Sequence, residues 1–80
     1  MIGKIGPAES TPYGWTRRWP GGHPCIVFTD RRCFGGRGFR WYVNDEAGAE
    51  VAQGQMDSMV KAAACAHAVV VALGWLHASE

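Results

Sequence analysis

Only one segment of this 80-residue sequence has the composition of a helix, DSMVKAAACAHAVVVALGWLHASE near the C-terminus. Alanine dominates its early turns, and alanine is the strongest helix former. Asp57 or Ser58 is a suitable N-cap, so we expect a helix over residues 57–76. The segments before it are rich in β-branched and aromatic residues. Strands followed by a single helix indicate an α+β fold.

The predicted helix is apolar on more than one side. At about 100° per residue, one face should cover the sheet. This face contains Met59, Ala63, Ala66, Val70 and Leu73. The opposite stripe contains Ser58, Lys61, Cys65, Ala68 and Ala72. Beyond Cys65 few polar residues remain, so we expect this second side of the helix to pack against another segment or protein. Three candidates could pack there: the N-terminal segment, a target protein, or a second copy that contacts Cys65, Ala68 and Ala72.

Three runs over residues 24–55 predict an antiparallel meander of three strands. CIVFTD, FRWYVN and AEVAQGQ carry β-branched or aromatic residues, and glycine-bearing connections separate them. In the third strand we expect Val51 and Ala49 to face the core. Proline and glycine punctuate residues 1–22, which we expect to be irregular. The predicted architecture is therefore one α+β domain over residues 1–80, with a three-stranded sheet packed by one C-terminal helix.

The length of the apolar runs bears on location. The most apolar run, residues 62–76, has about fifteen residues, whereas a spanning helix needs roughly twenty. The N-terminal MIGKIGPAES lacks the apolar core of a signal peptide. We therefore expect a cytoplasmic protein that makes no membrane contact.

Charge is unevenly distributed along the chain, although the formal net charge is only +1. Residues 1–40 carry seven basic and two acidic side chains, whereas residues 41–80 carry one basic and five acidic side chains. Such asymmetry can mark a surface that binds an acidic partner. It also arises when arginines occupy loops and acids occupy turns and helix starts, and both interpretations stay open.

The candidate partner contacts come from two stretches, YGWTRRWPGG and TDRRCFGGRGFR. Tryptophan and arginine are over-represented among interface hot spots. The candidates are Trp15, Arg17, Arg18, Trp19, Arg31, Arg32, Arg37 and Arg40. The alternatives are structural: the tryptophans would cover one end of the core, and the arginines would keep a hairpin loop soluble.

The string RGFRWYV partly matches the RNP1 pattern of RRM domains, in which aromatic side chains stack on bases. Arg40 and Tyr42 depart from that pattern, and an RRM needs a second helix. The low net charge also argues against direct nucleic-acid binding. A small module that binds single strands through exposed arginines and aromatics is the alternative function.

No catalytic or metal-binding pattern is present. The serines lie in no nucleophile elbow, and FGGRG lacks the Lys-Ser/Thr of a P-loop. His23, Cys25, Cys33, Cys65 and His67 are candidate zinc ligands, but no C-x2-C pair accompanies them. We predict a non-enzymatic protein without a metal or cofactor, whose cysteines stay reduced in the cytoplasm.

The stretch GFRWYVNDEAGAEVAQGQMDSMVKAAACAHAVVVALGW resembles a pattern common among small phage and prophage proteins. In build and size the chain is similar to several anti-CRISPR proteins that act on type I surveillance complexes. The resemblance implies a stoichiometric inhibitor in the cytoplasm of an infected bacterium, which docks on the complex and blocks target DNA binding or nuclease recruitment. Many such inhibitors are acidic DNA mimics. This chain is not acidic, which favours docking through an arginine-rich patch.

Overall fold

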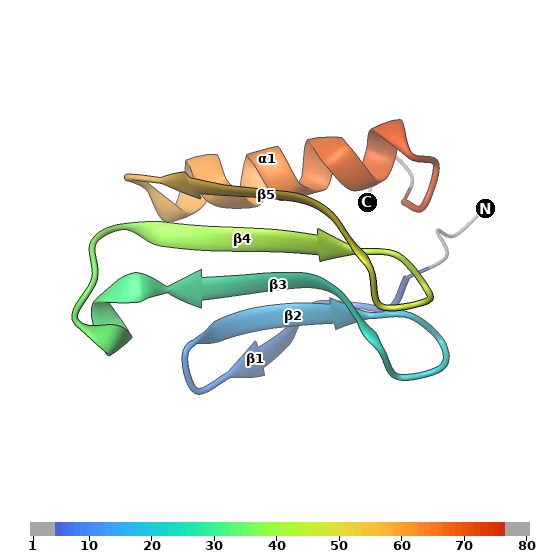
Figure 1. Ribbon diagram of the computed structural model, residues 1–80, viewed down its shortest axis with the longest axis horizontal. Coiled ribbons are helices and arrows are strands. Elements are labelled where there is room, and N and C mark those ends of the chain that lie inside the picture. The colour runs from blue at the N-terminus through green and yellow to red at the C-terminus, as the bar shows by residue number, and fades with distance from the viewer. Residues whose placement is uncertain (1–4, 77–80) are drawn as a thin grey trace.

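The computed structural model describes residues 5–76, apart from the side chains of Cys33 and Phe34, and contains one sheet and one long helix (Figure 1). The elements are β1 (Glu9–Thr11), β2 (Gly14–Arg18), β3 (Pro24–Asp30), the 3-10 helix η1 (Arg31–Phe34), β4 (Phe39–Asn44), β5 (Glu50–Met56) and α1 (Met59–Ala72). All paired strands are antiparallel, and their order in the sheet follows the chain. The predicted α+β class is confirmed, but the sheet has five strands rather than three.

The two additional strands, β1 and β2, lie within residues 1–22, where the prediction of an irregular segment was wrong. Thr11 pairs with Gly14, so Pro12 sits in the turn between the strands and removes no ladder hydrogen bond. Gly14 allows β2 to approach β3 closely, because a Cβ there would lie 2.1 Å from the carbonyl oxygen of Phe28. Proline and glycine therefore mark a hairpin here and not an unstructured stretch.

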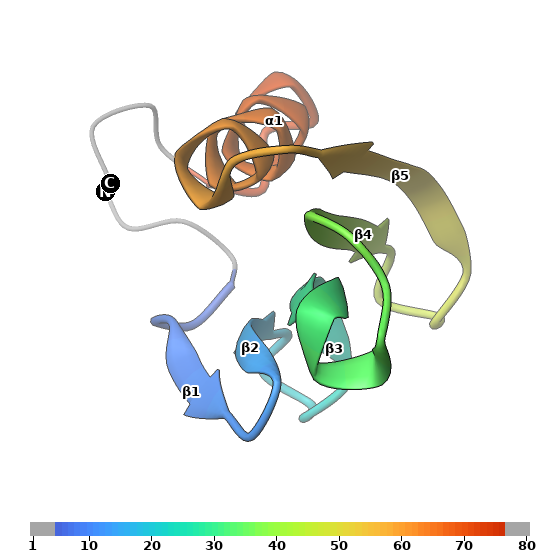
Figure 2. The same ribbon diagram turned by 90° about the vertical axis from the view of Figure 1, so that its left-hand side faces the viewer.

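The sheet curls, and α1 packs into its concave side (Figure 2). The helix lies against β3, β4 and β5. Among the described residues, no helix covers the opposite, convex face (Figure 2). One face of the sheet thus forms the core and the other is available to solvent.

Cross-strand register builds the core on the concave side. Phe28 pairs with Trp41 and Ile26 pairs with Val43, and all four side chains are buried. The indole of Trp41 lies over Gly54 of β5, where a Cβ would be 2.7 Å from its Nε1. A glycine in the edge strand thus makes room for the indole of a core tryptophan.

The predicted core face of the third strand of the meander, now β5, was wrong. Val51 is 47% exposed and Ala49 is exposed. The register of β4 with β5 shifts at Asn44, which leaves Val51 as an extra residue in β5. Ala52 lies opposite the buried Val43, so Ala52 faces the core and its neighbour Val51 faces outward. The side chains or positions that face the core are Ala52, Gly54 and Met56.

The helix meets the sheet through small side chains. Ala62, Ala66 and Val70 are fully buried, so the predicted face was right for Ala66 and Val70. It was wrong for Met59 and Leu73, which are 52% and 47% exposed. Small side chains at the contact let the helix backbone approach the sheet, and the buried face is the one that carries Ala62, Ala66 and Val70.

The helix ends at Ala72, four residues before the predicted end. Gly74 adopts a φ of 76°, which glycine tolerates without strain. Its N–H donates to the Val71 carbonyl at 3.0 Å, and the Trp75 N–H donates to the Val70 carbonyl at 2.9 Å. This pair of bonds is a Schellman motif. Within residues 5–76, no helix has the length and apolarity needed to cross a bilayer.

Candidate functional site

The structure separates the eight predicted contact residues into two groups. Trp15, Arg17, Arg18 and Trp19 belong to β2 and the residue that follows it. The other four lie in η1, the loop after it and the start of β4, at one end of the molecule (Figure 1). They are Arg31, Arg32, Arg37 and Arg40.

Trp19 is a core residue and does not belong to a contact surface. It is 4% exposed and packs edge-to-face on Trp75, with ring centroids 4.8 Å apart. Its Nε1 donates to the backbone carbonyl of Asn44 at 3.1 Å, which satisfies the one polar atom that burial would otherwise leave unpaired. Trp15 is half-buried and stacks on Phe28 at 5.5 Å. Both tryptophans therefore serve the core.

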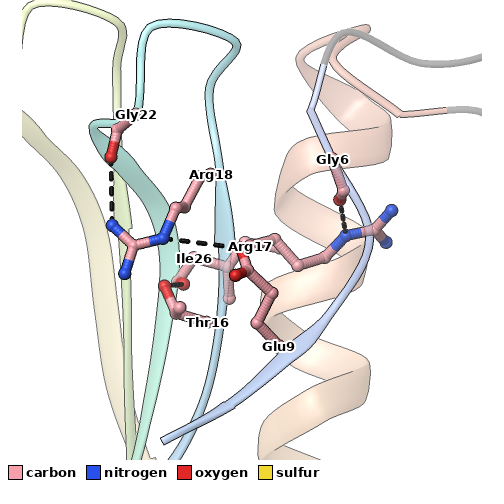
Figure 3. Close-up of polar contacts among 7 residues, drawn as sticks. All are labelled: Gly6, Glu9, Thr16, Arg17, Arg18, Gly22 and Ile26. Atoms are coloured by element: carbon pink, nitrogen blue, oxygen red, sulfur yellow. Dashed lines mark hydrogen bonds and ion pairs between the residues drawn. The ribbon is translucent and has the colours of Figure 1, made fainter.

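Arg17 and Arg18 point to opposite faces of β2, and each holds a segment of backbone (Figure 3). The Nε of Arg17 donates to the Gly6 carbonyl at 2.6 Å, which ties the segment before β1 to the sheet. Arg18 donates from Nη1 to the Gly22 carbonyl at 3.0 Å, and its Nε lies 3.4 Å from a carboxylate oxygen of Glu9. These two arginines are engaged within the fold.

Asp30 fixes Arg32 at the start of η1. One carboxylate oxygen accepts the Arg32 backbone N–H at 3.0 Å, and the two oxygens accept Nε at 2.9 Å and Nη2 at 2.6 Å. These bonds hold the pKa of the Asp30 carboxyl below its usual value. The Arg32 guanidinium also lies over the ring of Phe39, 4.8 Å from its centroid. The charge of Arg32 is therefore neutralised and its position is set.

The remaining arginines form what we call the arginine end, defined as Arg31, Arg37 and Arg40. Among the described residues, none of the three has a carboxylate within 4.0 Å. Arg40 donates from Nη2 to the side-chain oxygen of Gln53 and lies over the ring of Tyr42, 5.2 Å from its centroid. Arg37 is exposed, whereas Arg31 and Arg40 are half-buried, and their Nε atoms are buried without a hydrogen-bond partner among the described residues.

The arginine end is continuous with the convex face of the sheet. Arg40 pairs with Thr29 and with Gln55, whose Nε2 donates to the Arg37 carbonyl at 3.0 Å. The Gln55 bond fixes the loop against the sheet. Sequence reasoning missed Gln53 and Gln55 as neighbours of these arginines, because only the β4–β5 register brings them together.

The candidate metal ligands and the buried Cys25 thiol are the groups that bear on metal or nucleophilic chemistry. No three His, Cys, Asp or Glu side chains in the part of the chain that the structure describes are close enough to hold a metal ion, and the Cys33 side chain, one of the candidate ligands, lies outside the described residues. Burial raises the pKa of the Cys25 thiol to about 11, although nearby Arg17 acts against the shift. A thiol with that pKa stays protonated near neutral pH and is a poor nucleophile.

Comparison with known proteins identifies no relative: no family model matches the chain, and neither a curated protein nor a solved structure is detectably similar.

Proposed function

We propose that this chain is a non-catalytic protein that binds a protein partner through the arginine end and inhibits it. The observation that supports the proposal is the electrostatic difference between neighbouring arginines. Arg32 is neutralised by Asp30 within the fold, whereas Arg31, Arg37 and Arg40 have no carboxylate at ion-pair distance among the described residues. An acidic protein surface would supply the missing carboxylates, and guanidinium groups bind these in bidentate geometry.

The resemblance in build to small anti-CRISPR proteins gives the first partner to test, a type I CRISPR surveillance complex. Such a partner presents both protein surfaces and channels for nucleic acid. An arginine-bearing inhibitor would dock on an acidic protein patch rather than occupy a DNA channel as an acidic mimic does. The inhibition would be stoichiometric, with target DNA binding or nuclease recruitment as the blocked step.

The test is co-elution. The purified chain is mixed with a type I surveillance complex and examined by size-exclusion chromatography with light scattering, and target DNA is then added. We expect a stable complex that has lost DNA or nuclease binding. Separate elution from complexes of several subtypes would contradict the assignment to CRISPR complexes.

Charge reversal locates the contact surface. Arg31→Glu with Arg37→Glu should weaken the association by about tenfold or more, because two contacts become repulsive. Ala8→Glu is the control for added negative charge, since Ala8 is exposed and precedes β1, outside η1, the loop after it and β4. Circular dichroism must show that each variant is folded. Equal weakening by the control would show that the partner responds to net charge and not to this surface.

Binding to single-stranded nucleic acid is the second candidate, and the placement of Arg40 over Tyr42 on the convex face favours it. A base could stack near this pair while Arg37 contacts phosphate. Fluorescence anisotropy with labelled single-stranded DNA and RNA tests it. With three arginines engaged, affinity should fall roughly twentyfold between 50 and 200 mM salt. Absence of binding at the lower salt concentration would exclude this function.

A further inference from the structure

The outer edge of β5 is the least protected part of the sheet. β5 has seven residues and is the last strand in the sheet order, whereas the opposite edge strand β1 has three. Among the described residues, no strand pairs with the outer side of β5. Proteins protect such edges with lysine, proline, β-bulges, short strands or a covering element. β5 has a bulge at Val51, next to its first residue, and the strand from Ala52 to Met56 is regular. The sequence EVAQGQM contains neither lysine nor proline, and its single charge, Glu50, lies at the first position.

A strand that extends the sheet beyond β5 must meet two requirements. Side chains on the concave side must be small or apolar, since Ala52, Gly54 and Met56 of β5 lie there. Side chains on the convex side must be polar, because they lie beside Gln53 and Gln55, which are exposed. β5 itself has this alternation, so its edge is complementary to a second copy of the same strand.

Antiparallel pairing of two β5 strands about Gln53 satisfies both faces at once. Gln53 then lies opposite its own equivalent, and the two amides can exchange hydrogen bonds. Ala52 lies opposite Gly54, and Val51 lies opposite Gln55. Glu50 lies opposite Met56, so no like charges face one another. This is an isologous contact, in which the same surface serves both partners.

The position of α1 supports the same arrangement. The helix runs along β5 (Figures 1 and 2), so two copies joined through β5 carry both helices on one face of a continuous sheet. Val60 is 75% exposed, and Ala64, Ala68 and Ala72 are also exposed. Small side chains allow helices to approach closely, so the dimer offers a cover for apolar surface that the single chain leaves in water.

We propose that a second copy of this chain binds the outer edge of β5, antiparallel about a two-fold axis at Gln53, and forms a ten-stranded sheet. This dimer surface adjoins the arginine end, because Gln53 accepts from Arg40 and Gln55 donates to the Arg37 carbonyl. The dimer is inferred from the edge of β5 and does not rest on the proposed inhibitory function.

Sedimentation velocity over a range of concentrations, combined with hydrogen exchange, tests the dimer. We expect a dimer fraction that rises with concentration and amide protection within residues 51–56 that rises with it. A monomer at every concentration would overturn the proposal. So would protection of these amides that develops only when another protein is added, because the occupant would then be a foreign strand.

Gln53→Glu tests the pairing directly. The carboxylate still accepts from Arg40 within each copy, so the monomer keeps its contact. In the dimer the two carboxylates at the axis cannot donate to each other, so the exchanged amide hydrogen bonds are lost. This loss, together with the repulsion that Arg40 does not offset, should raise the dissociation constant about tenfold. Ala8→Glu is the matched control, because it makes the same charge change at an exposed residue before β1. A dimer that Gln53→Glu leaves intact, or that the control weakens equally, would overturn the β5 assignment.

Discussion

Gly14 and Gly54 show how single positions set the spacing of the sheet. At Gly14 the neighbour of an added Cβ would be the Phe28 backbone, whereas at Gly54 it would be the Trp41 indole. A side chain can shift more easily than a hydrogen-bonded strand. Of these two positions, Gly14 is therefore the one at which an added carbon should be tolerated less.

Gly14→Ala should lower the free energy of unfolding by more than about 2 kcal/mol, because its Cβ would lie 2.1 Å from a backbone oxygen. Gly21→Ala is the matched control, since nothing lies within 4 Å of a Cβ there and its φ is not positive. The control should change stability by less than about 0.5 kcal/mol. Urea denaturation measures both. Equal stabilities of the two variants would contradict the close approach of β2 and β3.

The Asp30–Arg32 contact gives a pH-dependent contribution to stability. Because the pKa of Asp30 is lowered in the folded state, its contribution is present above the unfolded pKa of about 3.9. The contribution is lost as pH falls through the folded value. Asp30→Asn removes it. We expect the difference in unfolding free energy between wild type and variant to be constant from pH 5 to 7 and to shrink below pH 4. A difference that is unchanged at pH 2 would show that the carboxylate charge is not its source.

At the scale of the element, the secondary-structure type of β5 and α1 was predictable from the sequence. Which of their side chains face the core was not. The run before the helix contains the right residues for β5, but its register with β4, in which Ala52 lies opposite Val43, decides which side chains face the core. The helix was predicted from its alanines. Its rotation depends on how it packs against β3, β4 and β5, which no period within the segment specifies.

The rotation of α1 is tested by one substitution at two helix positions. Ala66→Leu inserts a larger side chain at a fully buried contact and should cost about 1–3 kcal/mol. Ala64→Leu places the same side chain on the exposed side and should be nearly neutral. Thermal unfolding in dilute solution distinguishes them. If Ala64→Leu were the more damaging variant, the helix would pack on the sheet through another face.

At the scale of the whole molecule, the candidate site was predictable in composition and not in arrangement. The arginine-bearing loop after β3 lies at the surface, as its glycines and charges indicated, and its role in binding stays a prediction. The sequence did not decide whether Trp19 is a core or a contact residue, because the ring that packs on it, Trp75, is distant in the sequence. The strands β1 and β2 were missed for a similar reason: β2 is held in place by its pairing with β3.

One core cluster joins the two ends of the described chain, since it includes Ile5, Trp19 and Leu76 together with residues of every layer. We therefore expect the N-terminal strands and α1 to unfold together in one transition. Trp75→Ala removes the ring that packs on Trp19 and should lower stability by about 2 kcal/mol or more. The tryptophan fluorescence of the variant, which retains Trp15, Trp19 and Trp41, and its far-UV circular dichroism should shift to the same lower urea midpoint. A fluorescence transition that precedes the loss of helix would show that the N-terminal segment and α1 are separate cooperative units.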